Sequence, residues 1–209
     1  MRKFLFTFLG LIVAALLWGP AAGQEPEAFT ESVVIFNTIC AKCHEGQCSG
    51  RMSFDEAYEA SADHIVRHYN AVSDKEWLRR ELYLILNHMK EECNYYPMNV
   101  PLPPKRVWLA GTLDKMSTLL EKNYFIPLGP LVAGEYRLEL DLESDSRISV
   151  QLVSESFDTV VEDCYDAGQM RLKIPFAITD PGNHYVRTYP QRPVRILRLA
   201  VVPTGQQSQ

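Results

Sequence analysis

The stretch EYRLELDL, residues 135–142, alternates strictly between charged and apolar side chains. Its apolar positions are Tyr136, Leu138, Leu140 and Leu142. Because successive side chains of a strand point to opposite faces, this period of two predicts a β-strand with one buried and one solvated face. A polar turn, ESDS (143–146), leads into RISVQLV (147–153), where the alternation returns. The sequence therefore predicts two successive strands here.

Further strands are predicted towards the C-terminus. Alternation from 170 to 176 indicates one strand, DPGN (180–183) indicates a turn, and VRILRLAVV (194–202) indicates the last strand. Five or six short antiparallel strands over about 75 residues are typical of a small β-sandwich. We expect this sandwich at residues 127–209, including a short polar tail.

The sequence of the predicted sandwich contains little catalytic chemistry. It has no phosphate loop, no metal-ligand cluster and no nucleophile beside a base. Tyr165, Tyr185 and Tyr189 are the side chains that could stack on a sugar ring or on a partner protein, although tyrosines in strands more often serve packing. We expect a structural or docking role for this part, with carbohydrate contact as the alternative.

From residue 28 to 122 the periodicity is helical. A first helix is expected from Glu27 or Thr30 to Ile39. SFDE (53–56) and SDKE (73–76) have the spacing of capping boxes and predict two more helix starts. The helix that begins at the second box runs to about residue 92, with an apolar stripe on one side. The stripe consists of Leu78, Leu82, Ile85, Met89 and Cys93.

A last helix is predicted after the prolines at 103–104, because proline suits the first helical turn. Its apolar face would consist of Leu109, Leu113, Met116 and Leu120. In NYFIPLGPLVAGE (123–135), prolines and glycines break regular structure. The predicted fold class is therefore α + β with two domains, an N-terminal all-α domain at 24–126 and a C-terminal antiparallel β-sandwich at 127–209.

The first residues have the composition of a secretory signal. Arg2 and Lys3 precede an apolar run from Phe4 to Trp18, and small residues follow at 21–23. The run is shorter than the ~20 residues of a membrane-spanning helix. We expect a signal peptide at 1–23, no stable membrane span after its cleavage, and a periplasmic protein. The net charge of −5 argues against nucleic acid as a partner.

ICAKCHEGQC (39–48) contains three cysteines and one histidine. Export favours cysteine oxidation, so a Cys40–Cys43 disulfide is one interpretation. A zinc ion bound by the thiolates of Cys40, Cys43, Cys48 and Cys93 is a second. Covalent haem is a third, because two thiols at this spacing can each add to a porphyrin vinyl group while the following histidine binds the iron. Only the haem interpretation requires a histidine directly after the second cysteine, at the position of His44.

With the C-x-x-C-H motif complete and a predicted helix before it, the chain resembles the class I c-type cytochromes over residues 27–122. The resemblance implies a cytochrome c-like N-terminal domain with one covalent haem c. Cys40 and Cys43 would be the thioether attachments and His44 the proximal ligand of the iron. In that family a methionine on a loop before the last helix is the distal ligand, and Met98 in YYPMNVPLPP (95–104) occupies the matching place.

Histidines compete with Met98 for the distal position. His88 is one alternative, and His64 and His68 are further candidates. Two histidines one turn apart are also typical of an ordinary helix surface. An open or water-filled position is the remaining option.

The other cysteines of the helical part suggest a disulfide. A bridge between Cys48 and Cys93 would join the two sides of the haem pocket and close a loop of about 45 residues, which stabilises the fold by ~3 to 4 kcal/mol in the chain-entropy model. Cys164 would then stay an unpaired, buried thiol.

Together these features predict an exported electron carrier and not an enzyme. One haem iron would cycle between the ferric and ferrous states and serve redox protein partners. The first alternative is a haem-based sensor or a small peroxidase-like enzyme with an open or displaceable sixth ligand. The second is an accessory haem subunit that docks through the β-sandwich.

Overall fold

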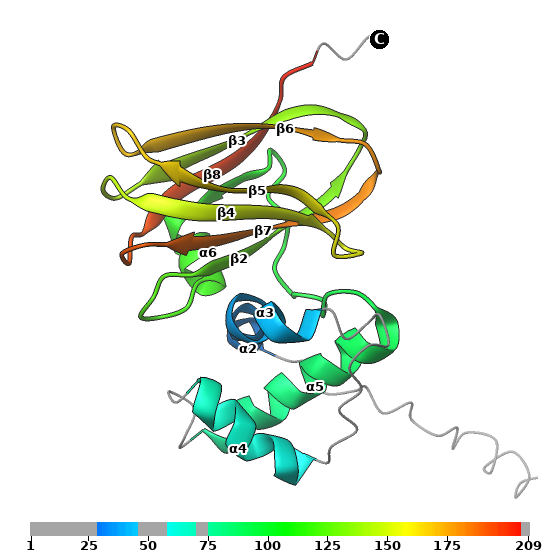
Figure 1. The fold of residues 1–209 in the computed structure, drawn as a ribbon. Coiled ribbons are helices and arrows are strands. Elements are labelled where there is room, and N and C mark those ends of the chain that lie inside the picture. The colour runs from blue at the N-terminus through cyan, green and yellow to red at the C-terminus, as the bar shows by residue number, and fades with distance from the viewer. Residues whose placement is uncertain (1–28, 46–57, 70–74, 206–209) are drawn as a thin grey trace, which may run out of the picture.

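The computed structural model describes residues 29–45, 58–69 and 75–205 (Figure 1). The predicted signal peptide, Cys48 and the serines that open both predicted capping boxes lie outside these residues. Predictions that rest on them are therefore not addressed by the fold.

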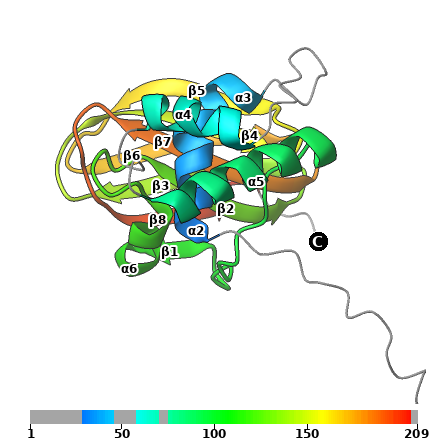
Figure 2. The same cartoon turned by 90° about the horizontal axis from the view of Figure 1, so that it is seen from below.

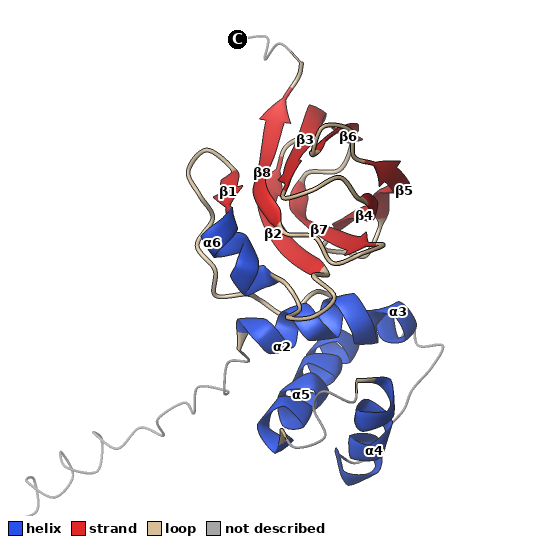
Figure 3. Cartoon of the chain, turned by 90° about the vertical axis from the view of Figure 1, so that its left-hand side faces the viewer, coloured by secondary structure: helices blue, strands red, loops and turns tan. Residues whose placement is uncertain are grey.

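Two four-stranded antiparallel sheets face each other in a β-sandwich (Figures 1 and 3). The strands are β1 (Val107–Leu109), β2 (Tyr124–Leu131), β3 (Gly134–Leu142), β4 (Arg147–Ser154), β5 (Thr159–Asp166), β6 (Arg171–Ile178), β7 (Gly182–Pro190) and β8 (Ile196–Pro203). The strand order is β1-β8-β3-β6 in one sheet and β2-β7-β4-β5 in the other. Strands β3 and β4 follow each other along the chain but belong to different sheets, so the turn ESDS crosses from one sheet to the other.

The alternation found in the sequence matches the two faces of the strands. In β3, β4 and β6 the apolar positions are buried and their neighbours are more exposed, which confirms these predicted strands. Strand β5 is mostly exposed along its length and lies at the edge of its sheet. Its charged residues Glu162 and Asp163 disfavour pairing of this edge with another chain.

Strand β2 is buried on both faces. Its sequence YFIPLGPL is an almost continuous apolar run, the pattern of a strand covered on both sides. The helical turns near residues 36–40 and 114–116 contact it. Because β2 is an edge strand next to β7, its prolines are tolerated. Gly129, with φ of +74°, lies where the pairing register with β7 shifts.

Helices α2 to α5 lie beneath the β2 side of the sandwich, whereas α6 lies beside it next to β1 and β8 (Figures 1 and 3). They are α2 (Thr30–Ile35), the π-helical turn η1 (Phe36–Cys40), α3 (Ala41–His44), α4 (Tyr58–His68), α5 (Glu76–Glu92), α6 (Ala110–Leu113) and the 3₁₀ turn η4 (Asp114–Met116). Elements α2, η1 and α3 follow one another without a break, and α4 and α5 cross them on the side away from the sandwich (Figure 2). None of the helices described here is both long and apolar enough to cross a membrane.

The predicted first helix is confirmed and continues as far as His44. The inward stripe of α5 is confirmed as well, since Leu78, Leu82, Ile85 and Met89 are all buried. Cys93 does not extend this stripe, because it is exposed and ends the helix.

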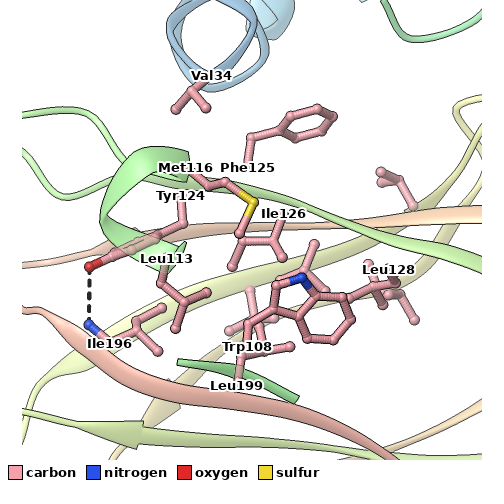
Figure 4. Packing of buried hydrophobic residues seen from close by; sticks show 14 of the residues in the cluster. Val34, Trp108, Leu113, Met116, Tyr124, Phe125, Ile126, Leu128, Ile196 and Leu199 are labelled. Atoms are coloured by element: carbon pink, nitrogen blue, oxygen red, sulfur yellow. Dashed lines mark hydrogen bonds between the residues drawn. The ribbon is translucent and has the colours of Figure 1, made fainter. Parts of the chain in front are cut away.

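Helical and β residues share one hydrophobic core. Val34 of α2 points towards Met116 and Phe125 (Figure 4), and all three side chains are at most 1% exposed. Deeper in the core, the backbone N–H of Ile196 donates a hydrogen bond of 3.0 Å to the hydroxyl of Tyr124. The helix that begins at Thr30 therefore packs directly on the sandwich.

The predicted fold class is wrong. The chain is mainly β, with two antiparallel four-stranded sheets and short helices, and its described residues include no separate all-α, cytochrome c-like domain. The physical reason is the placement of α2 and η1. Their buried face is covered by β2 and η4 as well as by α5, so it belongs to the core of the sandwich.

The helix predicted after the prolines at 103–104 is also wrong. The segment forms β1, which pairs with β8, followed by the short elements α6 and η4. Leu113 and Met116 are buried as expected, but Leu109 and Leu120 are 60% and 68% exposed. Backbone pairing with β8 overrides a helical preference that valine, tryptophan and glycine already weaken.

Candidate functional site

A cavity of about 330 Å³ lies between η1, α3, α4 and α5, and most of its surface is apolar, although Ser61, Arg67 and Tyr83 also line it. The apolar wall includes Phe36, Ile39, Ile65, Leu82 and Leu86. The sulfur and nitrogen donors in the lining are Cys40, Cys43, His44, His64 and His68. The structure thus brings the whole C-x-x-C-H motif together with two histidines of α4.

The backbone before the motif has an unusual conformation. Element η1 is a π-helical turn, and the N–H of Ala41 at its end donates to the carbonyl of Phe36. Such turns are rare and occur frequently at functional sites. Cys40 ends this turn, and Cys43 follows three residues later on the same side of the helix, so both thiols reach the cavity.

Two imidazoles approach each other across the cavity. The ring centres of His44 and His64 are 5.9 Å apart, with an angle of 78° between the ring planes. His68, one turn further along α4, has its ring centre 4.5 Å from that of His64. His64 and His68 are exposed on the face of α4 that borders the cavity.

Cys40 and Cys43 are free thiols. Burial, together with a smaller effect of Cys43, raises the pKa of the Cys40 thiol to about 12. Cys40 therefore keeps its proton at neutral pH, whereas cysteines that catalyse thiol–disulfide exchange have lowered pKa values. The arrangement favours neither a redox-active dithiol nor the disulfide interpretation of this pair.

The thiols and imidazoles line the cavity but do not converge on one position where a metal ion could bind. Within residues 29–45, 58–69 and 75–205, no group of three or more histidine, cysteine, aspartate or glutamate side chains is arranged to hold a metal ion. Cys48, one of the four thiolates of the zinc interpretation, lies outside those residues.

Met98 and His88, the expected distal ligands, lie elsewhere. Met98 is partly buried and packs against the hydrophobic core. The His88 ring donates a 2.8 Å hydrogen bond from Nε2 to the side-chain oxygen of Asn94. It also packs edge-on against Tyr96, with ring centres 4.9 Å apart. Neither Met98 nor His88 lines the cavity that holds the motif.

Glu45, the residue after the motif, is tied to the sandwich. Its carboxylate accepts two hydrogen bonds of 2.9 and 2.6 Å from the guanidinium of Arg187 on β7. Tyr95 donates its hydroxyl hydrogen to the same carboxylate and accepts a 2.8 Å hydrogen bond from Arg187. Burial raises the pKa of Tyr95, so its hydroxyl stays protonated. The network anchors the end of the motif helix on β7.

Cys93 and Cys164, the described cysteines outside the C-x-x-C-H motif, differ in state. Cys93 ends α5 in the left-handed conformation, with φ of 53°, and is disulfide-bonded. Its predicted partner Cys48 lies outside the described residues, so the pairing stays a prediction. Cys164 is a free thiol that is exposed on β5, and the expectation that it is buried is wrong.

Two of the three tyrosines predicted for sugar or partner contact pack against other parts of this chain. Tyr185 stacks on Phe125 with ring centres 5.2 Å apart and meets Tyr95 edge-on. The ammonium group of Lys42 lies 4.3 Å from the ring centre of Tyr189. Tyr185 and Tyr189 therefore form part of the junction between the helices and the sandwich.

No protein-family model matches the chain, and no curated protein is similar to it in sequence. Among solved structures, a family GH115 4-O-methyl-α-glucuronidase with specificity for decorated arabinogalactans matches with a TM-score of 0.37 and 13% identity, over 70% of this chain and 25% of that one. A mutant of a family 29 carbohydrate-binding module matches with a TM-score of 0.27 and 10% identity, over 42% of this chain and 64% of that one. At these scores neither likeness bears on function.

The sequence did not single out the residues of other elements that approach the C-x-x-C-H motif in the fold. His64 and His68 were considered as ligands, but only the packing of α4 on α5 turns them towards His44. Their spacing of one helical turn, in the next predicted helix after the motif, was the available signal. Arg187 had no signal in the sequence, because alternation along a strand does not reveal which partner a buried cation finds.

Proposed function

We propose that this chain is an exported c-type haem protein that carries electrons one at a time between redox protein partners. The haem would be held covalently by Cys40 and Cys43, with His44 as an iron ligand. The observation that supports this proposal is that these three side chains line one cavity, opposite two further imidazoles and among apolar residues.

The residues present fit a covalent haem. Each free thiol can add its S–H across one vinyl double bond, which forms a thioether without any oxidant or reductant. The cavity volume of about 330 Å³ is within the roughly 300 to 1,000 Å³ of cofactor and ligand pockets. The apolar wall suits the faces of a porphyrin, and the imidazole of His44 suits iron.

The chain itself would set the conditions for electron transfer. His44 would supply a nitrogen ligand from the end of a helix that Glu45 anchors to the sandwich. Phe36, Leu82 and Leu86 would exclude water from the site and lower its dielectric constant, which tunes the reduction potential. When bound, the haem supplies an iron that alternates between ferric and ferrous states.

The partner surfaces are part of the proposal. A redox partner must come close to the cavity, and the open side of α4 offers that access. Docking through the sandwich, as in an accessory subunit, is the second arrangement. For a carbohydrate contact, which stays a prediction, the polar cavity of about 390 Å³ around Glu155, Asp180 and His184 is the place that the sandwich offers.

The test is co-expression of the exported chain with a haem-attachment system, followed by denaturing electrophoresis with haem staining. The wild-type chain should carry haem that survives denaturation. The double variant Cys40→Ser/Cys43→Ser should lose it, because both attachment sulfurs are gone. Cys164→Ser is the matched control, since it removes an exposed thiol far from the cavity, and it should keep the haem.

A wild-type chain without covalent haem would overturn the proposal. The thiols and imidazoles of the cavity would then have to serve a different chemistry. Retention of haem by the double cysteine variant would show that the motif is not the attachment site.

A further inference from the structure

The distance between two imidazoles in the cavity bears on the second axial ligand. A bond between a metal and an imidazole nitrogen is about 2 Å long, so two imidazoles that bind one metal from opposite sides have ring centres roughly 6 Å apart. The ring centres of His44 and His64 are 5.9 Å apart. The two rings are thus already at the separation that bis-imidazole ligation requires.

The two rings also come from different helices that line the same cavity. His44 ends α3, and His64 lies in the middle of α4, which packs on α5 across the cavity. A ligand pair from two separate elements can hold a flat group between them. Residues on one helix turn, such as His64 and His68, cannot do so.

From these observations we infer that His64, and not Met98, is the distal ligand of the haem iron, so that the iron is held between two histidines. The inference rests on the proposed function, because it presupposes that the haem is bound at Cys40, Cys43 and His44. It replaces the methionine that the sequence resemblance implied.

The other candidates have different surroundings. Met98 packs against the hydrophobic core, and His88 is engaged with Asn94 and Tyr96. His68 is nearest to His64, with a centre-to-centre distance of 4.5 Å, and its ring restricts the orientation of the His64 ring. His68 is therefore a positioning residue, since groups around a ligand commonly orient it.

Two strong nitrogen ligands have a functional consequence. They leave no open position for a gas or peroxide, which favours electron transfer over sensing or peroxidase-like chemistry. Methionine as an axial ligand raises the reduction potential of a c-type haem. With two histidines, the potential should be lower than that of a histidine–methionine site.

The inference is tested on the holo-protein by optical absorption and electron paramagnetic resonance. The ferric wild type should be low-spin without the weak far-red band of sulfur ligation, and the reduced protein should not bind carbon monoxide. His64→Ala should become high-spin and bind carbon monoxide, and added imidazole should restore the low-spin spectrum. Restoration shows that the variant is folded. Met98→Leu, at a residue that does not line the cavity, is the control and should stay low-spin.

Two other results have distinct meanings. Covalent haem with a sulfur band that disappears in Met98→Leu, or a His64→Ala spectrum like that of the wild type, would overturn this inference and leave the proposed function intact. A wild type with no covalent haem would overturn the proposed function, and the ligand assignment with it.

Discussion

Arg187 is the residue that connects the motif helix with the sandwich. Its side chain is 4% exposed and forms a two-bond ion pair with Glu45, which is 25% exposed. The guanidinium also lies 5.2 Å from the ring centre of Tyr95 and 5.8 Å from that of Phe125. A cation in such a place is stable only while its partners are present, because burial penalises an unpaired charge.

Removal of this cation should destabilise the fold. Arg187→Met leaves Glu45 and Tyr95 without their partner, and we expect a loss of about 3 kcal/mol in the free energy of unfolding, measured with urea at pH 7. The matched control is Arg171→Met, which breaks an exposed pair with Asp141 and should change little. The double variant Glu45→Gln/Arg187→Met should be more stable than the sum of its single variants implies. A single Arg187→Met variant as stable as the control would show that the pair contributes nothing.

The sequence could predict some residues of the candidate site and not others. Cys40, Cys43 and His44 were found because the motif is local, with every member within one helical turn of the next. His64 could not be singled out, since its approach to His44 depends on how α4 packs. Met98 is predicted through a resemblance to a fold that the chain does not have; in the structure it is partly buried against the hydrophobic core and does not line the cavity.

At the scale of elements, β2 shows why a strand can be missed in a sequence. Alternation indicates strands with one solvent-exposed face, but β2 is covered on both faces and has no alternation. Its prolines and glycines read as breakers in NYFIPLGPLVAGE, although they are compatible with an edge strand that contains a register shift. The helix predicted after the prolines at 103–104 failed for a related reason. The spacing of its apolar residues matches one face of a helix by coincidence, although the segment pairs with β8.

Gly129 should be required for the bend in β2. Its φ of +74° is strained for any residue with a side chain, and a Cβ there would come within 2.2 Å of the Leu102 side chain. Because Leu102 is 44% exposed and can move, the backbone strain should dominate. We expect Gly129→Ala to cost about 1 to 3 kcal/mol in urea unfolding.

Gly111→Ala is the control for that substitution. This glycine lies in α6, and a Cβ there meets nothing within 4 Å. We expect it to be neutral or stabilising by up to about 1 kcal/mol. Equal effects of the two variants would contradict the role assigned to the backbone of β2.

The ion pair that fastens η4 near the start of β8 should make stability depend on pH. Hydrogen bonds from Arg195, at 3.0 and 3.2 Å from Nε, hold the pKa of Asp114 below its usual value. The stabilisation is therefore complete above about pH 4, the pKa of an unfolded aspartate, and is lost as the pH falls through the lower folded pKa. We expect Asp114→Asn to lower Tm by about 2 °C at pH 7.

Calorimetry from pH 7 down to pH 2 checks this dependence. The difference in Tm between wild type and Asp114→Asn should shrink at the acid end, because the wild-type carboxyl is then protonated as well. Glu121→Gln, on the exposed loop before β2, is the control and should have no effect at pH 7. A difference that is constant over the whole range would show that the ion pair is not its cause.

At the scale of the whole molecule, the sequence predicted individual helices and strands better than it predicted how they pack together. Helical and β periodicity correctly predicted several elements, including α5 and β3. Their assembly was predicted as two domains because the character of the sequence changes near residue 127. The apolar residues of α2 could not reveal that their partners lie beyond this change, at Met116 and Phe125.

A shared core predicts that helices and sandwich unfold together. In a Trp18→Phe/Trp77→Phe background, Trp108 of β1 is the only tryptophan of the chain and reports on the sandwich by fluorescence, since it is 1% exposed. Circular dichroism in the far ultraviolet reports on the helices. Both signals should have the same midpoint. Val34→Ala, in α2, should lower the free energy of unfolding measured by both probes by about 2 kcal/mol. Its side chain packs on Met116 of η4 and Phe125 of β2.

Glu31→Gln, on an exposed position of the same helix, is the matched control and should leave both transitions in place. The decisive comparison is the Trp108 signal of Val34→Ala. If the helical signal moved to lower urea while the Trp108 transition stayed at its wild-type midpoint, the helices would be an independent unit. If both move together, a change at the cavity of the C-x-x-C-H motif can reach the sandwich through packing alone, because the two parts then share one unfolding equilibrium.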